Sequence, residues 1–235
     1  MINVAEIFMS YQGEGPLMGS RTLFIRLQGC NQRCQWCDTK HALGATMGKE
    51  YSAQDLFDKI KELKVNEFDS FDICITGGEP MLQQTDKELL DFLFWAHIHH
   101  RVTLETNGTI VPEVDFISKF DTICISPKLQ AAGAKNPVNV DTMMKFADTL
   151  FANEIKARVI YKYVVDPHKM PECIQEIQKI HEKFPVEAID IFLMPITDSP
   201  DSDVIEGTKL IKKYLMENNL PYSITTRLHL AIGAY

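Results

Sequence analysis

The chain alternates short runs of β-branched and aromatic residues with longer runs whose apolar residues recur at helical spacing. Strands and helices that alternate in this way build right-handed strand–helix–strand units around a parallel sheet. The pattern therefore predicts an α/β fold. We expect Ser52 to cap the first helix and Pro171 to lie in a first helical turn, where its missing N–H costs nothing. The expected strands are 22–28, 71–76, 102–105, 122–126, 157–165, 188–194 and 222–226, and the expected helices are 53–63, 86–97, 141–150, 171–184 and 202–218.

Polar or glycine-rich segments follow four of the expected strands. They are Gly29-Cys30, Gly77-Gly78-Glu79-Pro80, Thr106-Asn107-Gly108 and Ser126-Pro127-Lys128. Functional residues of parallel sheets and barrels gather at the carboxyl ends of the strands. These four segments therefore predict one site at one edge of the sheet.

Three cysteines lie close together in the first of these segments. Cys30, Cys34 and Cys37 have the spacing C-x-x-x-C-x-x-C. Thiolates are soft ligands that favour iron–sulfur clusters and zinc. Three thiolates on a 4Fe–4S cubane leave one iron free to bind the amino and carboxylate groups of S-adenosylmethionine (SAM). This spacing directly after a strand is the signature of radical SAM enzymes.

A structural zinc site is the alternative for the same residues. His41 follows Cys37 by four positions, so the three cysteines and His41 would complete a tetrahedral Cys₃His site. Zinc sites usually present two ligand pairs on separate turns, which this compact run does not provide. The compact spacing favours the cluster.

Gly77-Gly78-Glu79-Pro80 lies about forty residues beyond the cysteines, at the end of the next expected strand. Glycines allow a close approach of the backbone because they have no Cβ. Main-chain groups at this point, and the Glu79 carboxylate, are candidates for the methionyl amino group of SAM. An ordinary strand-to-helix turn is the alternative for an isolated motif of this kind.

Composition narrows the class of protein. The 235 residues carry a formal net charge of −8 with the basic residues scattered among acids, which argues against nucleic-acid binding. No apolar run is long enough to span a bilayer, and the first ten residues do not read as a signal peptide. We expect a single domain over 1–235, a cytoplasmic location and reduced thiols, so Cys74, Cys124 and Cys173 are expected to be packing residues.

Longer motifs resemble one family, the 7-carboxy-7-deazaguanine synthases of queuosine and 7-deazapurine biosynthesis. The resemblance extends from about residue 7 to the C-terminus and is weak between 138 and 185. The matching segments are Tyr11-Gln12-Gly13-Glu14-Gly15, Phe24 to Cys30, Cys37-Asp38-Thr39-Lys40-His41, Thr76 to Pro80, Glu105-Thr106-Asn107-Gly108-Thr109 and Ile125-Ser126-Pro127-Lys128-Leu129.

This resemblance implies a modified partial (β/α) barrel of the radical SAM type, working as a homodimer with an electron donor such as flavodoxin. It implies the conversion of 6-carboxy-5,6,7,8-tetrahydropterin to 7-carboxy-7-deazaguanine with loss of ammonia. SAM would act as a cofactor that is regenerated, because the hydrogen taken from carbon 6 of the pterin returns after ring contraction. A Mg²⁺ ion would assist.

The resemblance also implies roles for individual residues. Arg26 would pair with the substrate carboxylate through its two-donor guanidinium, and the amide of Gln12 would read the pyrimidinone edge. Thr39 would bind Mg²⁺, which takes few protein oxygens. The remaining substrate residues are Tyr11, Gly13, Glu14, Thr76 and Tyr235, and the cofactor-binding residues are Trp36, Cys37, Asp38, Gly78, Glu79, Ser126, Pro127, Lys128, Met194 and Thr197.

The C-terminus departs from the family pattern. Members often end in Gln-Thr-His-Lys and a few more residues, whereas this chain has Thr225-Thr226-Arg227-Leu228 and continues to Tyr235.

Two other functions remain open from the residues alone. One is an activating enzyme for a glycyl-radical protein, which shares the cysteine triplet and Gly-Gly-Glu-Pro but does not require Gln12 and Glu14. The other is a zinc-stabilised binding module.

Overall fold

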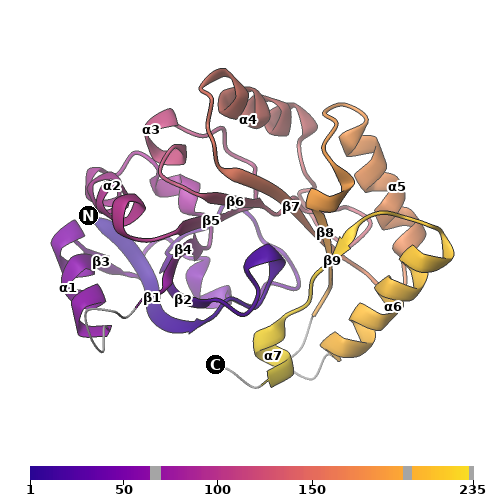
Figure 1. The fold of residues 1–235 in the computed structure, drawn as a ribbon, viewed down its shortest axis with the longest axis horizontal. Coiled ribbons are helices and arrows are strands. Elements are labelled where there is room, and N and C mark those ends of the chain that lie inside the picture. The colour runs from indigo at the N-terminus through magenta and orange to yellow at the C-terminus, as the bar shows by residue number, and fades with distance from the viewer. Residues whose placement is uncertain (64–69, 198–202, 233–235) are drawn as a thin grey trace.

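A single curved sheet forms the centre of the computed structural model, which describes residues 1–63, 70–197 and 203–232. Within these residues nine strands run in the order β3-β1-β2-β4-β5-β6-β7-β8-β9, so the row does not close on itself (Figure 1). The strands are β1 (Ile2–Tyr11), β2 (Arg21–Leu27), β3 (Lys49–Tyr51), β4 (Asp72–Gly77), β5 (Val102–Thr106), β6 (Thr122–Ile125), β7 (Arg158–Val165), β8 (Ile191–Pro195) and β9 (Ser223–Ile224).

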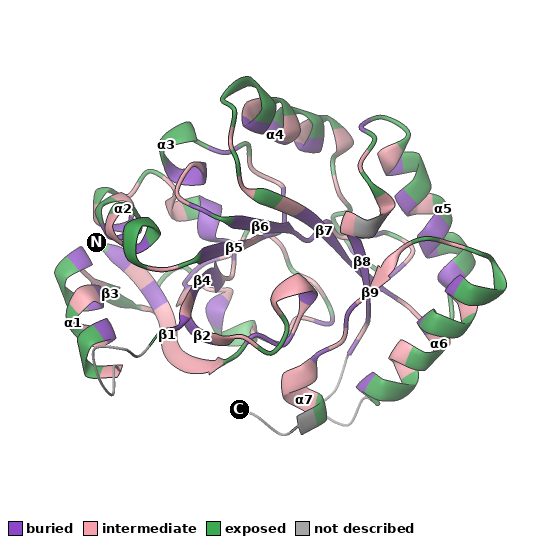
Figure 2. Ribbon diagram, in the orientation of Figure 1, coloured by how far each residue is buried: buried purple, intermediate pink, exposed green. Residues whose placement is uncertain are grey.

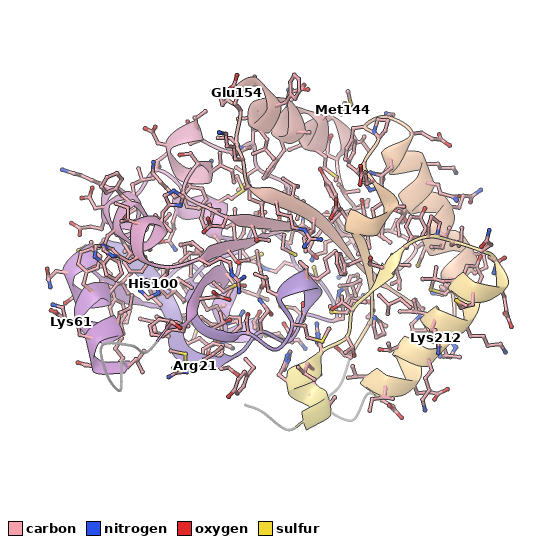
Figure 3. All side chains as sticks on the ribbon, in the orientation of Figure 1. Arg21, Lys61, His100, Met144, Glu154 and Lys212 are labelled. Atoms are coloured by element: carbon pink, nitrogen blue, oxygen red, sulfur yellow. The ribbon has the colours of Figure 1, made fainter. Side chains whose placement is uncertain are left out.

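Helices follow one another around the outside of this sheet (Figure 1). They are α1 (Ala53–Leu63), α2 (Lys87–His99), α3 (Val114–Ile117), α4 (Val140–Ala152), α5 (Met170–His181), α6 (Val204–Glu217) and α7 (Leu228–Ile232). Their sheet-facing sides and the central strands are buried, whereas their outer faces are exposed (Figure 2). Lys61 on α1 and Lys212 on α6 lie on these outer surfaces (Figure 3). One contiguous apolar core therefore lies between the sheet and the helices.

Seven neighbouring strands, β2 and β4 to β9, are parallel. The prediction of an α/β fold with a modified partial (β/α) barrel is confirmed, with the parallel sheet in this part. It was incomplete at the other edge, where β1 pairs antiparallel with both β2 and β3. The strand β1 escaped the sequence pattern because only Ile2 and Val4 of its ten residues are buried, so its second half lacks an apolar repeat.

The helix starts follow local capping chemistry. The Ser52 hydroxyl accepts the backbone N–H of Asp55 at 3.1 Å, and the Asp55 carboxylate accepts the backbone N–H of Ser52 at 2.8 Å, a reciprocal cap at the start of α1. Pro171 lies in the first turn of α5. Both expectations are confirmed. The helix α7 and the short α3 were not predicted, since neither is long enough to show a helical repeat.

The parallel strands bring the four polar segments to the same edge of the sheet, as the topology requires. No helix in the described part of the chain is both long and apolar enough to cross a bilayer.

Candidate functional site

A cavity of about 630 Å³ opens at the carboxyl ends of the parallel strands. Its walls come from β1, β2, the cysteine segment, the ends of β4 to β8 and the segment after β9. Most of the residues singled out from the sequence meet there. They are Tyr11, Gln12, Gly13, Glu14, Arg26, Cys30, Cys34, Trp36, Cys37, Asp38, Thr39, Thr76, Gly78, Ser126, Lys128 and Met194.

The cysteine segment forms a compact loop on this wall. All three thiols are half-buried and line the cavity. The Arg33 guanidinium donates to the carbonyl oxygens of Cys30 at 2.6 Å and Gln32 at 2.7 Å, which fixes the turn. Burial raises the pKa of Cys30 and of Cys34, and the neighbouring thiols raise that of Cys30 further. Three soft ligands on one loop beside free volume suit a group that takes three thiolates.

The zinc alternative has no support in this geometry. No three His, Cys, Asp or Glu side chains among the described residues converge as the ligands of one ion do. His41 lies instead against Glu6, with Nε2 at 3.3 Å from Oε1. In a 4Fe–4S cluster each thiolate binds a different iron, so the three sulfurs do not have to meet at one point. The loop therefore fits a cluster better than a single ion.

The two glycines after β4 are required by the packing of the chain on itself. A Cβ on Gly77 would lie 2.4 Å from the carbonyl oxygen of Leu27, and one on Gly78 would lie 2.0 Å from that of Gly29. The backbone N–H of Gly78 donates to Leu27 at 3.0 Å. Only glycine allows the end of β4 to hold the cysteine segment this closely. The expected close approach is therefore present, but its partner is the neighbouring backbone.

Glu79 is fully buried, and its carboxylate is bound by other groups of the protein in this structure. Its carboxylate accepts hydrogen bonds from Thr106 Oγ1 at 2.6 Å, the Asn107 backbone N–H at 2.7 Å and the Met81 backbone N–H at 3.1 Å. Burial raises its pKa, and these three donors oppose that effect. Glu79 does not appear among the described residues that line the cavity. It ties the ends of β4 and β5 together behind the wall.

The fourth polar segment, Ser126-Pro127-Lys128 after β6, presents a lysine and a hydroxyl to the cavity. Lys128 Nζ donates to Ser126 Oγ at 3.0 Å, and burial lowers the pKa of Lys128. Trp36 and Met194 lie on the same lining and are nearly fully buried. Pro127 and Thr197 are not among the described lining residues. The cavity here offers an ammonium, a hydroxyl and apolar surface.

Arg26 projects from β2 into the cavity with part of its guanidinium already engaged. Its Nε donates to Glu6 Oε1 at 2.5 Å, and its guanidinium carbon lies 5.8 Å from the centre of the Phe8 ring. Phe8 stacks on Phe24 with ring centres 5.0 Å apart. Because the contact to Glu6 uses the inner nitrogen and Arg26 lines the cavity, its two terminal nitrogens are candidates for binding a carboxylate.

The loop after β1 forms the opposite part of the lining. Gln12 Nε2 donates to Glu105 Oε1 at 3.2 Å, and Thr76 Oγ1 donates to Glu105 Oε2 at 2.9 Å. The Gln12 amide oxygen accepts the backbone N–H of Glu14 at 3.2 Å. Glu105, which sequence reasoning did not assign, thus holds two of the predicted substrate residues.

Arg227 connects three separate segments at the mouth. Its guanidinium contacts Asp38 Oδ2 at 3.1 Å through NH2, Glu14 Oε1 at 3.4 Å through Nε, and the Thr197 hydroxyl through NH1. The backbone N–H of Leu228 also donates to Gly13 at 2.9 Å. The C-terminal segment therefore holds the cysteine loop and the loop after β1 together. Tyr235 lies outside the described residues.

Lys162 is the lining residue that the sequence analysis missed most clearly. It lies in β7 with 6 % of its surface exposed and contacts Glu14 Oε2 directly. A signal was present, because a lysine interrupts a run that is otherwise apolar or aromatic from Val159 to Val165. The isolated charge in a buried strand was read as part of an ordinary strand.

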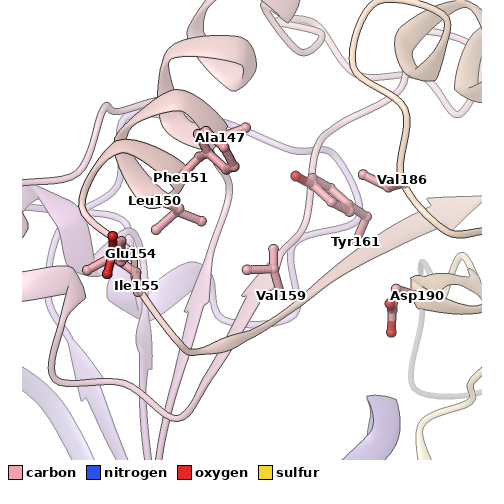
Figure 4. Close-up of a pocket in the computed structure, with 9 residues that line it drawn as sticks. All are labelled: Ala147, Leu150, Phe151, Glu154, Ile155, Val159, Tyr161, Val186 and Asp190. Atoms are coloured by element: carbon pink, nitrogen blue, oxygen red, sulfur yellow. The ribbon is translucent and has the colours of Figure 1, made fainter.

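A second cavity, of about 450 Å³, lies at the amino ends of β7 and β8 (Figure 4). It is lined by the end of α4 and by apolar residues such as Leu150, Val159 and Val186. None of the predicted site residues lies there, and none of its described lining residues is a cation. The chemistry-bearing side chains therefore belong to the cavity at the carboxyl ends.

Residues 24–199 match the model of the radical SAM superfamily. A 7-carboxy-7-deazaguanine synthase of Methanospirillum hungatei is 33% identical over 99% of this chain and 86% of its own, and one of Rhodopirellula baltica is 30% identical over 82% and 72%. A crystal structure of QueE from Escherichia coli aligns with a TM-score of 0.64 at 23% identity, covering 96% of this chain and 94% of that one. Native anSMEcpe with bound AdoMet aligns with a TM-score of 0.56 at 14% identity, covering 84% and 61%.

Proposed function

Because this chain belongs to the radical SAM superfamily and, within it, to the 7-carboxy-7-deazaguanine synthases, we propose that it contracts the ring of 6-carboxy-5,6,7,8-tetrahydropterin. The product is 7-carboxy-7-deazaguanine, formed with loss of ammonia on the route to queuosine and other 7-deazapurines. One observation carries the proposal: the cysteine triplet shares a cavity with a guanidinium fork and with the Gln12 and Glu14 side chains.

The chain offers a coherent set of groups for the two cofactors. Cys30, Cys34 and Cys37 would hold a 4Fe–4S cluster, and Lys128 with Ser126 would meet the carboxylate and ribose of SAM. When bound, the cluster and SAM together supply a radical that removes one hydrogen from the substrate. Trp36 and Met194 add buried apolar surface that keeps water from this part of the cavity.

The substrate would be oriented by its two chemically different ends. The carboxylate would take the two terminal nitrogens of Arg26, while Glu6 holds the third nitrogen in place. The aminopyrimidinone edge, rich in N–H donors, would face the acceptors of Gln12 and Glu14. Carbon 6, which carries the carboxylate, would then lie at the Arg26 end of the bound substrate.

Thr39 is the residue that would bind Mg²⁺. Its hydroxyl lines the cavity and lies 3.7 Å from Cys37 Sγ, so a hydrated ion bound there would reach both cofactor and substrate.

We expect Thr39→Ala to raise the Mg²⁺ concentration for half-maximal turnover by about 10- to 100-fold, the range typical of altered metal sites. SAM binding should stay unchanged. Thr39→Ser is the matched control, since it retains the hydroxyl and should retain the Mg²⁺ response. An identical Mg²⁺ titration for Thr39→Ala and the unmodified enzyme would remove Thr39 from the metal site.

The proposed function also implies a cellular location, an oligomeric state and an electron donor. It would act as a single domain in the cytoplasm, as a homodimer that receives electrons from a flavodoxin-type donor. All six cysteines are free thiols in this structure, which agrees with a reducing setting.

The fate of SAM tests the function against that of a glycyl-radical activating enzyme. Reconstituted enzyme, reductant and SAM are incubated with 6-carboxytetrahydropterin, and methionine release is compared with the loss of substrate. We expect many substrate molecules to be consumed for each methionine released, because SAM is regenerated. One methionine per turnover, or no consumption of the pterin, would contradict the proposal.

A further inference from the structure

Lys162 lies in a buried position, where an ammonium group carries a large desolvation cost. Alternate residues of β7 face the same side of the sheet, and its neighbours on that face, Ile160 and Val164, are apolar and buried. In the parallel register Lys162 lies opposite Phe192 of β8. Removing an ammonium from water costs several kcal/mol unless a partner compensates. That partner is Glu14.

The ion pair joins β7 to the loop after β1. Lys162 Nζ contacts Glu14 Oε2, and Arg227 Nε lies 3.4 Å from the other carboxylate oxygen. The Glu14 and Lys162 side chains are only 14% and 8% exposed. A buried ion pair is weak evidence for stability, since apolar residues of similar volume often serve as well. Both residues of the pair also line the cavity, which suggests a role in ligand binding and not in stability.

We propose that Lys162 is a positioning residue, which rests on the function proposed above: it holds Glu14 as a fixed acceptor and makes the cavity prefer an edge that donates N–H groups. Lys162 fixes one oxygen, Arg227 lies beside the other, and Gln12 fixes the Glu14 backbone. A carboxylate held in this way accepts hydrogen bonds and cannot donate one.

The charges around Glu14 support this role. Burial alone would raise its pKa, but Lys162 and then Arg227 outweigh burial and lower the pKa to about 2. His229 of α7, Glu105 of β5 and Cys124 of β6 also face this group of charges. The folded pKa is below the ordinary value, so Glu14 is ionised at neutral pH, and its ion pairing is lost as the pH falls through that lowered pKa.

The test measures binding without reductant, so that no turnover occurs. Two ligands are compared, 6-carboxytetrahydropterin and its analogue with an oxo group in place of the 2-amino group. The unmodified enzyme should prefer the amino ligand, with an affinity that Glu14 does not modulate between pH 6 and 9. Lys162→Met should weaken binding of the amino ligand by about 10- to 100-fold, with the greater loss at pH 6, and should reduce the preference over the oxo analogue.

Three further variants separate positioning from other roles. Lys162→Arg should restore the pH profile of the unmodified enzyme. Lys162→Met added to Glu14→Gln should change affinity by less than about threefold, because the acceptor is already gone. Lys212→Met on the exposed face of α6 is the matched control and should have no effect. Iron content and the thermal midpoint are recorded for each variant to detect misfolding.

Glu14 can also be followed without any ligand. Infrared difference spectra between pH 8 and pH 5 should show a protonated carboxyl band in Lys162→Met that is absent from the unmodified enzyme and from the double variant. Equal losses of affinity in the presence and absence of Glu14, or the lack of this band, would overturn the proposal. Failure of the unmodified enzyme to bind the pterin would instead contradict the proposed function, while the infrared result would still decide the role of Lys162.

Discussion

Replacing Cys30, Cys34 or Cys37 singly with Ala is expected to abolish SAM cleavage and to lower the iron content of the anaerobically purified protein. Each cysteine supplies one of three thiolates on the same loop, and the loop contains no fourth cysteine to take over. Loss of one ligand therefore leaves a cluster with two protein ligands. Iron analysis, the visible absorbance of the protein and methionine release from SAM measure the effect.

The buried cysteines provide matched controls. Cys74 and Cys173 are fully buried in the apolar core, and burial raises the pKa of each thiol. Cys74→Ala and Cys173→Ala should cost some stability but keep the iron. Retention of iron by Cys34→Ala together with its loss from Cys74→Ala would show that the ligands have been assigned wrongly.

Arg26→Ala is expected to raise the Michaelis constant for 6-carboxytetrahydropterin by orders of magnitude. Removing one partner of a buried, hydrogen-bonded charge pair costs about 2 to 5 kcal/mol, which corresponds to a fall in affinity of roughly 30-fold to several thousandfold. The Arg26 side chain is only 16% exposed and lies on the cavity wall, so we expect a loss in the upper half of this range. Steady-state kinetics with the carboxypterin as the varied substrate measures the change.

The effect of Arg26→Ala should be confined to the substrate. Iron content and SAM binding should remain normal, because the contacts of Arg26 within the described residues are with Glu6 and Phe8 and not with Cys30, Cys34 or Cys37. Arg26→Lys should rescue only in part, since a point ammonium cannot reproduce the planar fork. Arg158→Ala, an exposed arginine paired with Asp190, is the control. An unchanged Michaelis constant for Arg26→Ala would place the carboxylate elsewhere, with Arg227 as the next candidate.

The elements that pack in the middle of the sheet were the most predictable from sequence. The strands β2, β4 and β6 are buried over most of their length, so each contains a short apolar stretch that is followed by a polar segment. The parallel topology then implies that the segments after these strands meet at one edge. The strand β1 and the edge strand β3 beside it could not be found in this way, because few of their side chains are buried.

The site itself was predictable where a residue follows a strand, and not where a charge lies inside one. The cysteine triplet and Arg26 stand out by spacing and by type. Lys162 becomes interpretable only when Glu14, 148 positions away, is known to lie beside it. Glu79 shows the opposite case, since its motif predicts a ligand contact whereas its carboxylate closes three internal hydrogen bonds.

The measurement that tests the central claim most directly is the mass of the product. The enzyme is reconstituted with iron and sulfide under anaerobic conditions and incubated with SAM, reductant, Mg²⁺ and 6-carboxytetrahydropterin. The products are then separated and identified by mass spectrometry. We predict that the pterin is replaced by 7-carboxy-7-deazaguanine together with free ammonia, and that both are absent with Cys34→Ala. Complete cluster assembly and SAM binding, with the pterin recovered unchanged, would contradict the account.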